Sequence, residues 1–128
     1  MKTLAFTFEI ATTTAKNMYL PVPCRGNIAS CKASYGAESD KDEVITLTHN
    51  ATAVATITPL ADAGAAGIVT EGVMDTTNGG LIFDPDSTTA AEQMIKVSVT
   101  NATDAGCTVG LIIEYDDSAY VEQAASEA

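Results

Sequence analysis

The side chains with the strongest potential for nucleophilic catalysis are one histidine and three cysteines. His49 is the only histidine of the 128-residue chain, and the cysteines are Cys24, Cys31 and Cys107. A serine hydrolase would need His49 as its base, but no nucleophile elbow accompanies it. His49 ends a predicted strand beside a turn, so we interpret it as a turn-adjacent polar residue. Cysteine catalysis needs a histidine partner too, and no thiol lies in a recognisable motif.

The cysteines are also poorly spaced for a metal site. Six residues separate Cys24 from Cys31, which is not a structural zinc spacing. An odd cysteine count without a signal peptide favours free, mostly buried thiols. Cys31 and Cys107 lie on or beside apolar strand faces, where we interpret them as small hydrophobic residues. We therefore expect neither a metal site nor a bound cofactor.

Paired carboxylates are the remaining candidates for acid–base chemistry or cation binding. Asp84 with Asp86, and Asp116 with Asp117, lie in predicted loops and not opposite one another on strands. Calcium binding by the first pair, or by the acidic run at 40–43, is chemically more plausible, but neither matches the EF-hand pattern. The sequence therefore predicts no catalytic, cofactor-binding or metal-binding residue, and we do not expect an enzyme.

The charge balance excludes several classes of partner. The chain has 17 acidic and 6 basic residues, for a net charge of −11. Such a charge repels phosphate backbones and anionic lipid surfaces, so we expect neither nucleic acid nor a membrane as partner. The first ten residues alternate between apolar and polar types, unlike a signal peptide. We expect synthesis in the cytoplasm.

Alternation of apolar and polar residues dominates the chain and predicts strands. Leu4, Phe6, Phe8 and Ile10 form one such apolar face. Ala29, Cys31, Ala33 and Tyr35 form another. The remaining predicted strands are 18–23 (an edge strand, because of its prolines), 44–49, 53–58, 68–73, 81–83, 95–100 and 109–115. The segments 44–49 and 53–58 are expected to form a hairpin, and 88–93 one helical turn.

About eight short strands separated by turn signals predict an all-β fold, a single-domain antiparallel β-sandwich or jelly roll. We assign it to residues 1–115. From Asp116 the composition becomes acidic and rich in Ala and Ser, without a basic residue. Residues 116–128 are therefore predicted to be a flexible acidic tail.

The predicted strand surfaces carry Thr, Ala and Ser where Lys and Glu would be usual. Proteins that live alone in solution normally place charge on their strands, since it guards sheet edges against pairing. A permanent neighbour would explain this surface. Ordinary compositional bias explains it equally well.

Several segments together resemble the small cement, or decoration, proteins of tailed-bacteriophage heads. The first is Tyr-Leu-Pro-Val-Pro-Cys-Arg-Gly-Asn-Ile at 19–28. The others are the hairpin at 45–52, the Ala/Gly-rich loop that ends at Gly67, and the final strand pair that ends in Gly-Leu-Ile-Ile-Glu-Tyr at 110–115. The similarity covers roughly residues 3–115, and the cysteines and the acidic tail fall outside the pattern.

This resemblance implies a structural virion protein. Its fold would be a β-sandwich or jelly roll on the outer capsid surface, often a homotrimer, which clamps neighbouring major capsid protein subunits together. The family brings no catalytic motif to carry over. The alternative is a carbohydrate- or receptor-binding virion module, such as a head fibre or tail component. A groove with aromatic walls would favour that alternative, and a flat multi-subunit contact surface would favour a cement protein.

Overall fold

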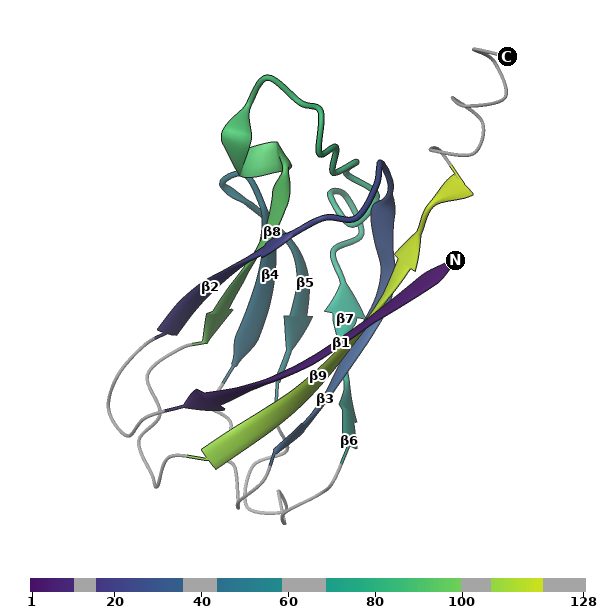
Figure 1. Ribbon diagram of the computed structural model, residues 1–128. Coiled ribbons are helices and arrows are strands. Elements are labelled where there is room, and N and C mark those ends of the chain that lie inside the picture. The colour runs from purple at the N-terminus through teal and green to yellow at the C-terminus, as the bar shows by residue number, and fades with distance from the viewer. Residues whose placement is uncertain (11–15, 36–43, 59–68, 100–106, 119–128) are drawn as a thin grey trace.

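The computed structural model describes residues 1–10, 16–35, 44–58, 69–99 and 107–118, which form two packed antiparallel sheets (Figure 1). The first sheet contains β1 (Lys2–Ile10), β9 (Cys107–Asp116), β3 (Asn27–Tyr35) and β6 (Val69–Glu71), in that order. The second sheet contains β2 (Lys16–Pro21), β8 (Met94–Val99), β4 (Ile45–His49), β5 (Thr52–Ile57) and β7 (Val73–Met74). The predicted all-β sandwich is confirmed.

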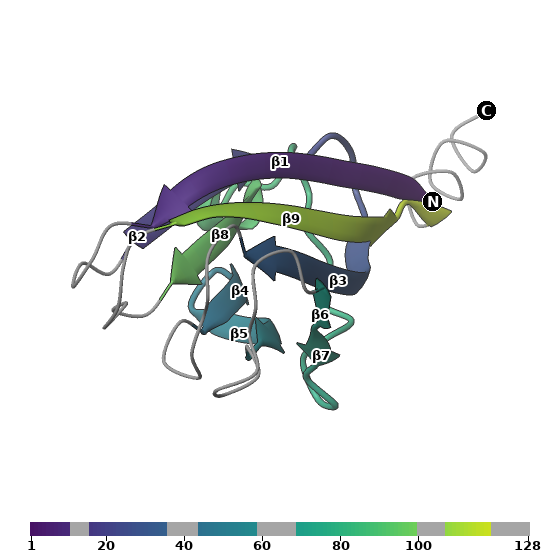
Figure 2. The same ribbon diagram turned by 90° about the horizontal axis from the view of Figure 1, so that it is seen from below.

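The first sheet is built around β9, which pairs with β1 on one side and β3 on the other. The β1 register runs without interruption from Lys2 opposite Tyr115 to Ile10 opposite Cys107. Because side chains alternate across a strand, one face of each strand is apolar and the other is small and polar. Figure 2 shows β1, β9 and β3 arching over the strands of the second sheet. The inward face of β9, with Val109, Leu111, Ile113 and Tyr115, is fully buried there.

The second sheet contains the predicted hairpin. β4 and β5 pair antiparallel across a turn at Asn50, whose φ of 55° is one that asparagine tolerates well. Ile45 and Leu47 share the buried face, as expected from their spacing. β2 is an edge strand that pairs only with β8, also as predicted. The predicted helical turn at 88–93 is a short 3-10 helix, η1 (Ala90–Glu92).

Two predictions about strands are wrong. Ala29 is exposed, because an irregularity in the pairing of β3 with β9 between Ile28 and Ser30 shifts the alternation and buries Ile28 instead. The segment 81–83 is not a strand. Its strand-like pairing is an isolated bridge, where Phe83 and Gly26 exchange backbone hydrogen bonds of 2.7 and 3.0 Å. The predicted loop through Gly67 and the predicted turn at 101–106 lie outside the described residues.

One side of the sandwich is closed by a strand that changes sheets at Gly72. β6 pairs with β3 of the first sheet, and β7 pairs with β5 of the second. Between them the Gly72 amide donates to the Cys31 carbonyl at 2.8 Å. A Cβ atom at Gly72 would collide with Cys31 Sγ and come within 3.0 Å of Ile57 Cγ1. Only glycine lets the backbone pass this close to both sheets.

The substitution Gly72→Ala tests this crossing. The added methyl group forces β3 and β5 apart, so the free energy of unfolding should fall by about 1–3 kcal/mol. Urea unfolding measures it. Gly110→Ala is the matched control, because a Cβ atom at Gly110 meets no atom within 4 Å. Its stability should stay at or slightly above that of the unsubstituted protein. Equal stability of the two variants would contradict this account of Gly72.

Candidate functional site

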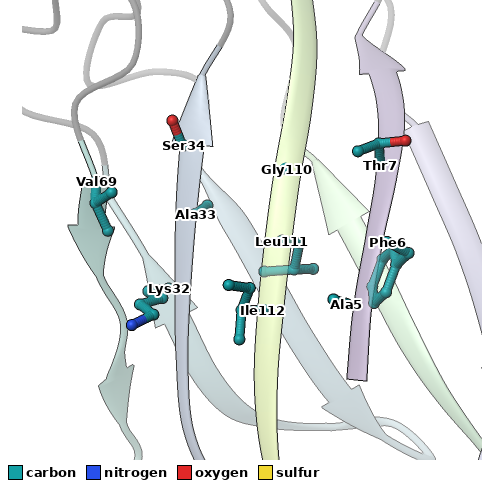
Figure 3. A pocket seen from close by; sticks show the side chains of 10 residues that line it. All are labelled: Ala5, Phe6, Thr7, Lys32, Ala33, Ser34, Val69, Gly110, Leu111 and Ile112. Carbon is teal, nitrogen blue, oxygen red and sulfur yellow. The ribbon is translucent and has the colours of Figure 1, made fainter. Parts of the chain in front are cut away.

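An open groove of about 480 Å³ lies on the outer face of the first sheet (Figure 3). We call it the outer groove. Its floor is the backbone of β9 around Gly110, and its walls include Thr7 of β1, Ser34 of β3 and Val69 of β6. The absence of a side chain at Gly110 produces the hollow, because the space above it is empty.

The strand register explains why these residues meet. Thr7 and Ser34 both lie directly opposite Gly110, and Val69 continues the same row. The next row places Ala5 and Lys32 on either side of Ile112. Directly opposed residues in an antiparallel pair share one face of the sheet, so small side chains gather at one place.

The chemistry of the outer groove is that of a contact surface. Lys32 is the only charged residue among those that line it. Thr7 and Ser34 supply hydroxyl groups, which donate and accept hydrogen bonds but have no base beside them in the lining. The aromatic residue Phe6 packs against the core, with its ring centroid 6.3 Å from that of Phe8. The outer groove therefore suits an apolar or small polar side chain of a partner.

The outer face of the second sheet is nearly free of charge. One row crosses all of its strands, and its members lie opposite one another in turn: Asn17, Ser98, Thr46, Thr56 and Val73. The adjacent row of Tyr19, Lys96 and Thr48 carries the one charge of the two rows. Val73 and Tyr19 are 72% and 58% exposed. None of the residues in these two rows is acidic, although the chain has a net charge of −11.

A second groove, the edge groove, lies between β1 and β2 on the open side of the sandwich. It measures about 360 Å³ and is lined by residues 3–6 of β1 together with Leu20 and Pro21 of β2. Leu4, Phe6 and Leu20 are half-buried and pack against the core. Among the described residues, no strand crosses between the sheets on this side as one does at Gly72, and half-buried apolar side chains line the groove between the two sheet edges.

His49 is a structural residue, although its burial was not expected. It is 7% exposed, and its Nε2 lies 2.7 Å from the Ile82 carbonyl oxygen. Its ring packs edge-on against Phe83 with centroids 4.8 Å apart. His49 thus ties the end of β4 to the segment that precedes η1. The sequence placed it correctly beside a turn, but nothing in the pattern showed that residues 82 and 83 would cover it.

Two of the cysteines are free and buried, as predicted. Cys24 is 6% exposed and Cys31 is 2% exposed. Burial, and to a lesser degree the Glu71 carboxylate, raises the pKa of the Cys31 thiol to about 11. Cys31 is therefore a protonated, unreactive thiol at neutral pH. The Cys107 side chain lies outside the described residues.

The acidic pairs are used in turns and in an ion pair. Asp84 Oδ1 accepts the Asp86 amide at 2.9 Å, and Asp116 Oδ1 accepts the Ser118 amide at 3.0 Å. Asp117 Oδ1 lies 3.1 Å from the Met1 ammonium group, which holds the pKa of that carboxyl below its ordinary value. Within the described ranges, no three potential metal ligands cluster. The run at 40–43 lies outside them.

A buried tyrosine hydroxyl links the first sheet to the segment after β2. Tyr115 is fully buried, and its hydroxyl donates to the Cys24 carbonyl at 2.6 Å. Burial raises the pKa of Tyr115 well above its ordinary value, and Cys24, Asp84 and Asp117 raise it further. The phenol therefore stays protonated and keeps donating far into the alkaline range.

Sequence reasoning identified neither groove. The signal for the outer groove was present in β9, where the apolar Ile112 occupies a position that alternation assigns to the outer face. What was missing is the register that brings Ala5, Thr7 and Ser34 beside it. The edge groove depends on how the two sheets diverge, which no local pattern records.

Comparisons with known proteins identify no relative of this chain. No family model, curated protein or solved structure matches the chain. No helix in the described residues is long and apolar enough to span a membrane. Functional inference therefore rests on the two grooves and the two outer sheet faces.

Alkylation tests the burial of Cys31. At pH 8 the raised pKa alone lowers the thiolate fraction about 100-fold relative to an unperturbed cysteine. Iodoacetamide should therefore modify Cys31 in the folded protein at least that much more slowly than in guanidinium chloride, as measured by mass spectrometry of the peptide. Glu71→Gln should change this rate little, because burial is the main cause. Equal rates in the folded and unfolded chain would show that Cys31 is accessible.

The Tyr115 hydrogen bond makes stability fall at high pH. Because the folded pKa of Tyr115 is raised, its contribution is complete below the ordinary value of 10.0 and is lost as the pH rises above it. Tyr115→Phe leaves the Cys24 carbonyl without its donor and should cost about 1–3 kcal/mol at pH 7. The variant should also lose less stability between pH 9 and 11 in urea titrations. Parallel pH curves for the two proteins would refute this role.

Proposed function

We propose that this protein is a structural component of a tailed-phage virion that binds the outside of the capsid lattice and stabilises contacts between major capsid protein subunits. The observation that carries the proposal is the outer groove, an open and nearly uncharged hollow around Gly110 on the four-stranded sheet. A partner side chain that enters it meets backbone and small side chains, which form a preorganised contact.

The charge distribution supports the same proposal. Of the acids on the outer face of the first sheet, Glu9 and Glu114 lie outside the rows that form the outer groove, and Glu71, at the end of the Ile112 row, lies opposite Lys32 and does not line the groove. A partner can therefore approach the groove without burying an unpaired carboxylate, which is costly at an interface. The two rows of the second sheet, in which Lys96 is the one charged residue, offer a further surface for a neighbouring subunit. The resemblance to cement proteins points to the major capsid protein as that partner and to a virion location.

The geometry gives less support to a carbohydrate- or receptor-binding module. Such sites stack sugars on exposed aromatic rings, and the one aromatic residue that lines the outer groove, Phe6, packs against the core. Tyr19 is exposed on the other sheet, opposite Lys96, and lines neither groove. We therefore do not adopt this second function.

Binding to phage heads that lack this protein tests the proposal. The purified chain should sediment with such heads at a fixed ratio to the major capsid protein and raise their resistance to heat. Gly110→Glu places a charge in the outer groove without a clash in the free protein, so head affinity should fall about tenfold or more. Thr108→Glu is the matched control, because Thr108 is an exposed residue of the same strand face outside the groove.

The outcomes separate the function from the site. Failure of the unsubstituted protein to bind heads, together with binding to a glycan array, would replace the proposal with the receptor-binding alternative. Equal head binding by Gly110→Glu and Thr108→Glu would remove the outer groove from the contact.

A further inference from the structure

Within the described ranges, no strand pairs with the outer edge of β1. Among the strands that end the two sheets, β6 and β7 have three and two residues, and β2 ends in Pro21, which lacks an amide donor. β1 has nine residues, contains neither proline nor glycine, and is uncharged from Thr3 to Phe8. Natural proteins normally blunt or cover an edge of this kind, because it pairs readily with another strand.

One hydrogen bond identifies which backbone groups of β1 face outward. Lys16 Nζ donates to the Glu9 carbonyl oxygen at 2.8 Å, so this carbonyl points away from β9. In an antiparallel strand, alternate residues direct both their N–H and their C=O to the same side. Thr3, Ala5 and Thr7 therefore present both groups at the free edge. The residues between them, Leu4 and Phe6, bond to β9.

The edge groove lies beside these groups. It adjoins residues 3–6, and its apolar lining includes Leu4, Phe6 and Leu20. A strand added to β1 would gain backbone hydrogen bonds from the edge and would place alternate side chains over this apolar lining. Backbone pairing combined with side-chain pockets is how added strands are recognised in general.

We infer that β1 pairs antiparallel with β1 of a second copy, around a twofold axis at Ala5, so that the two first sheets become one continuous sheet. In this register Ala5 lies opposite Ala5 of the second copy, and Thr3 lies opposite its Thr7. Each of these pairs exchanges both backbone hydrogen bonds. A register shifted by one pair toward the C-terminal end of β1 would require the Glu9 carbonyl, which Lys16 already occupies.

The edge is complementary to itself in this arrangement. On the outer side, threonine meets threonine, a favourable cross-strand pair. On the inner side, Leu4 lies opposite Phe6 of the second copy, so the apolar linings of two edge grooves cover each other. The antiparallel direction brings the Lys2 end of one strand to the Glu9 end of the other, whereas a parallel pair would align like charges. A twofold pair also differs from the threefold arrangement that the resemblance implies.

The mass of the pure protein in solution, measured by light scattering after size exclusion, tests the inference without any capsid. We expect twice the chain mass of 13.2 kDa. Ala5→Lys and Ala5→Glu each place like charges opposite one another at the twofold axis. Each should weaken self-association about tenfold, and mixing the two variants should restore a heterodimer. Ala5 is exposed, so neither change should unfold the monomer.

Thr108→Lys is the control, because it adds the same charge to an exposed residue of β9, away from the edge. It should remain dimeric. Hydrogen exchange gives a second readout: the amides of Thr3, Ala5 and Thr7 should be protected in the dimer and exposed in Ala5→Lys. A mass of one chain, a trimer, or a dimer that Ala5→Lys leaves unchanged would overturn the inference. None of these outcomes depends on head binding, which is measured separately.

Discussion

The hydrogen-bond register of β9 between β1 and β3 is the constraint on which the rest of the structure depends. It buries Tyr115 together with the other apolar residues on the inward face of β9. The Tyr115 hydroxyl then anchors the segment after β2 by donating a hydrogen bond to the Cys24 carbonyl. The same register aligns Thr7, Gly110 and Ser34 on the opposite face. A shift by one residue would exchange the two faces of β9, so core and outer groove arise from a single pairing.

The two sides of the sandwich differ in how their edges are closed. At Gly72 the chain passes from one sheet to the other, close enough that only a glycine fits. On the opposite side β1 and β2 belong to different sheets and leave half-buried leucine and phenylalanine side chains between them. The crossing at Gly72 joins the two sheets on one side, and the open side presents an edge and an apolar groove. The inferred pairing of β1 rests on this open side, where a second copy completes the edge.

The distribution of charge matters more for function than its total. A net charge of −11 would keep the molecules apart in solution through long-range repulsion. The outer groove and the cross-sheet row from Asn17 to Val73 carry almost none of that charge. Close contact at these places therefore avoids the desolvation of carboxylates, which is the main cost of burying an acidic surface. Contacts confined to such surfaces allow a strongly acidic protein to bind neighbours without losing repulsion elsewhere.

The sequence alone determined most of the strands, though not the predicted one at 81–83, because alternation and turn residues are local signals. It predicted the hairpin around Asn50, the edge position of β2 and the buried thiols of Cys24 and Cys31. It misplaced Ala29, since an irregularity in strand pairing is a property of two strands together. The pairing of β9 with both neighbours, the burial of His49 under Phe83 and both grooves were decided by tertiary structure. Each of these joins residues far apart in the chain, and alternation states which face a residue takes but not which residue lies opposite.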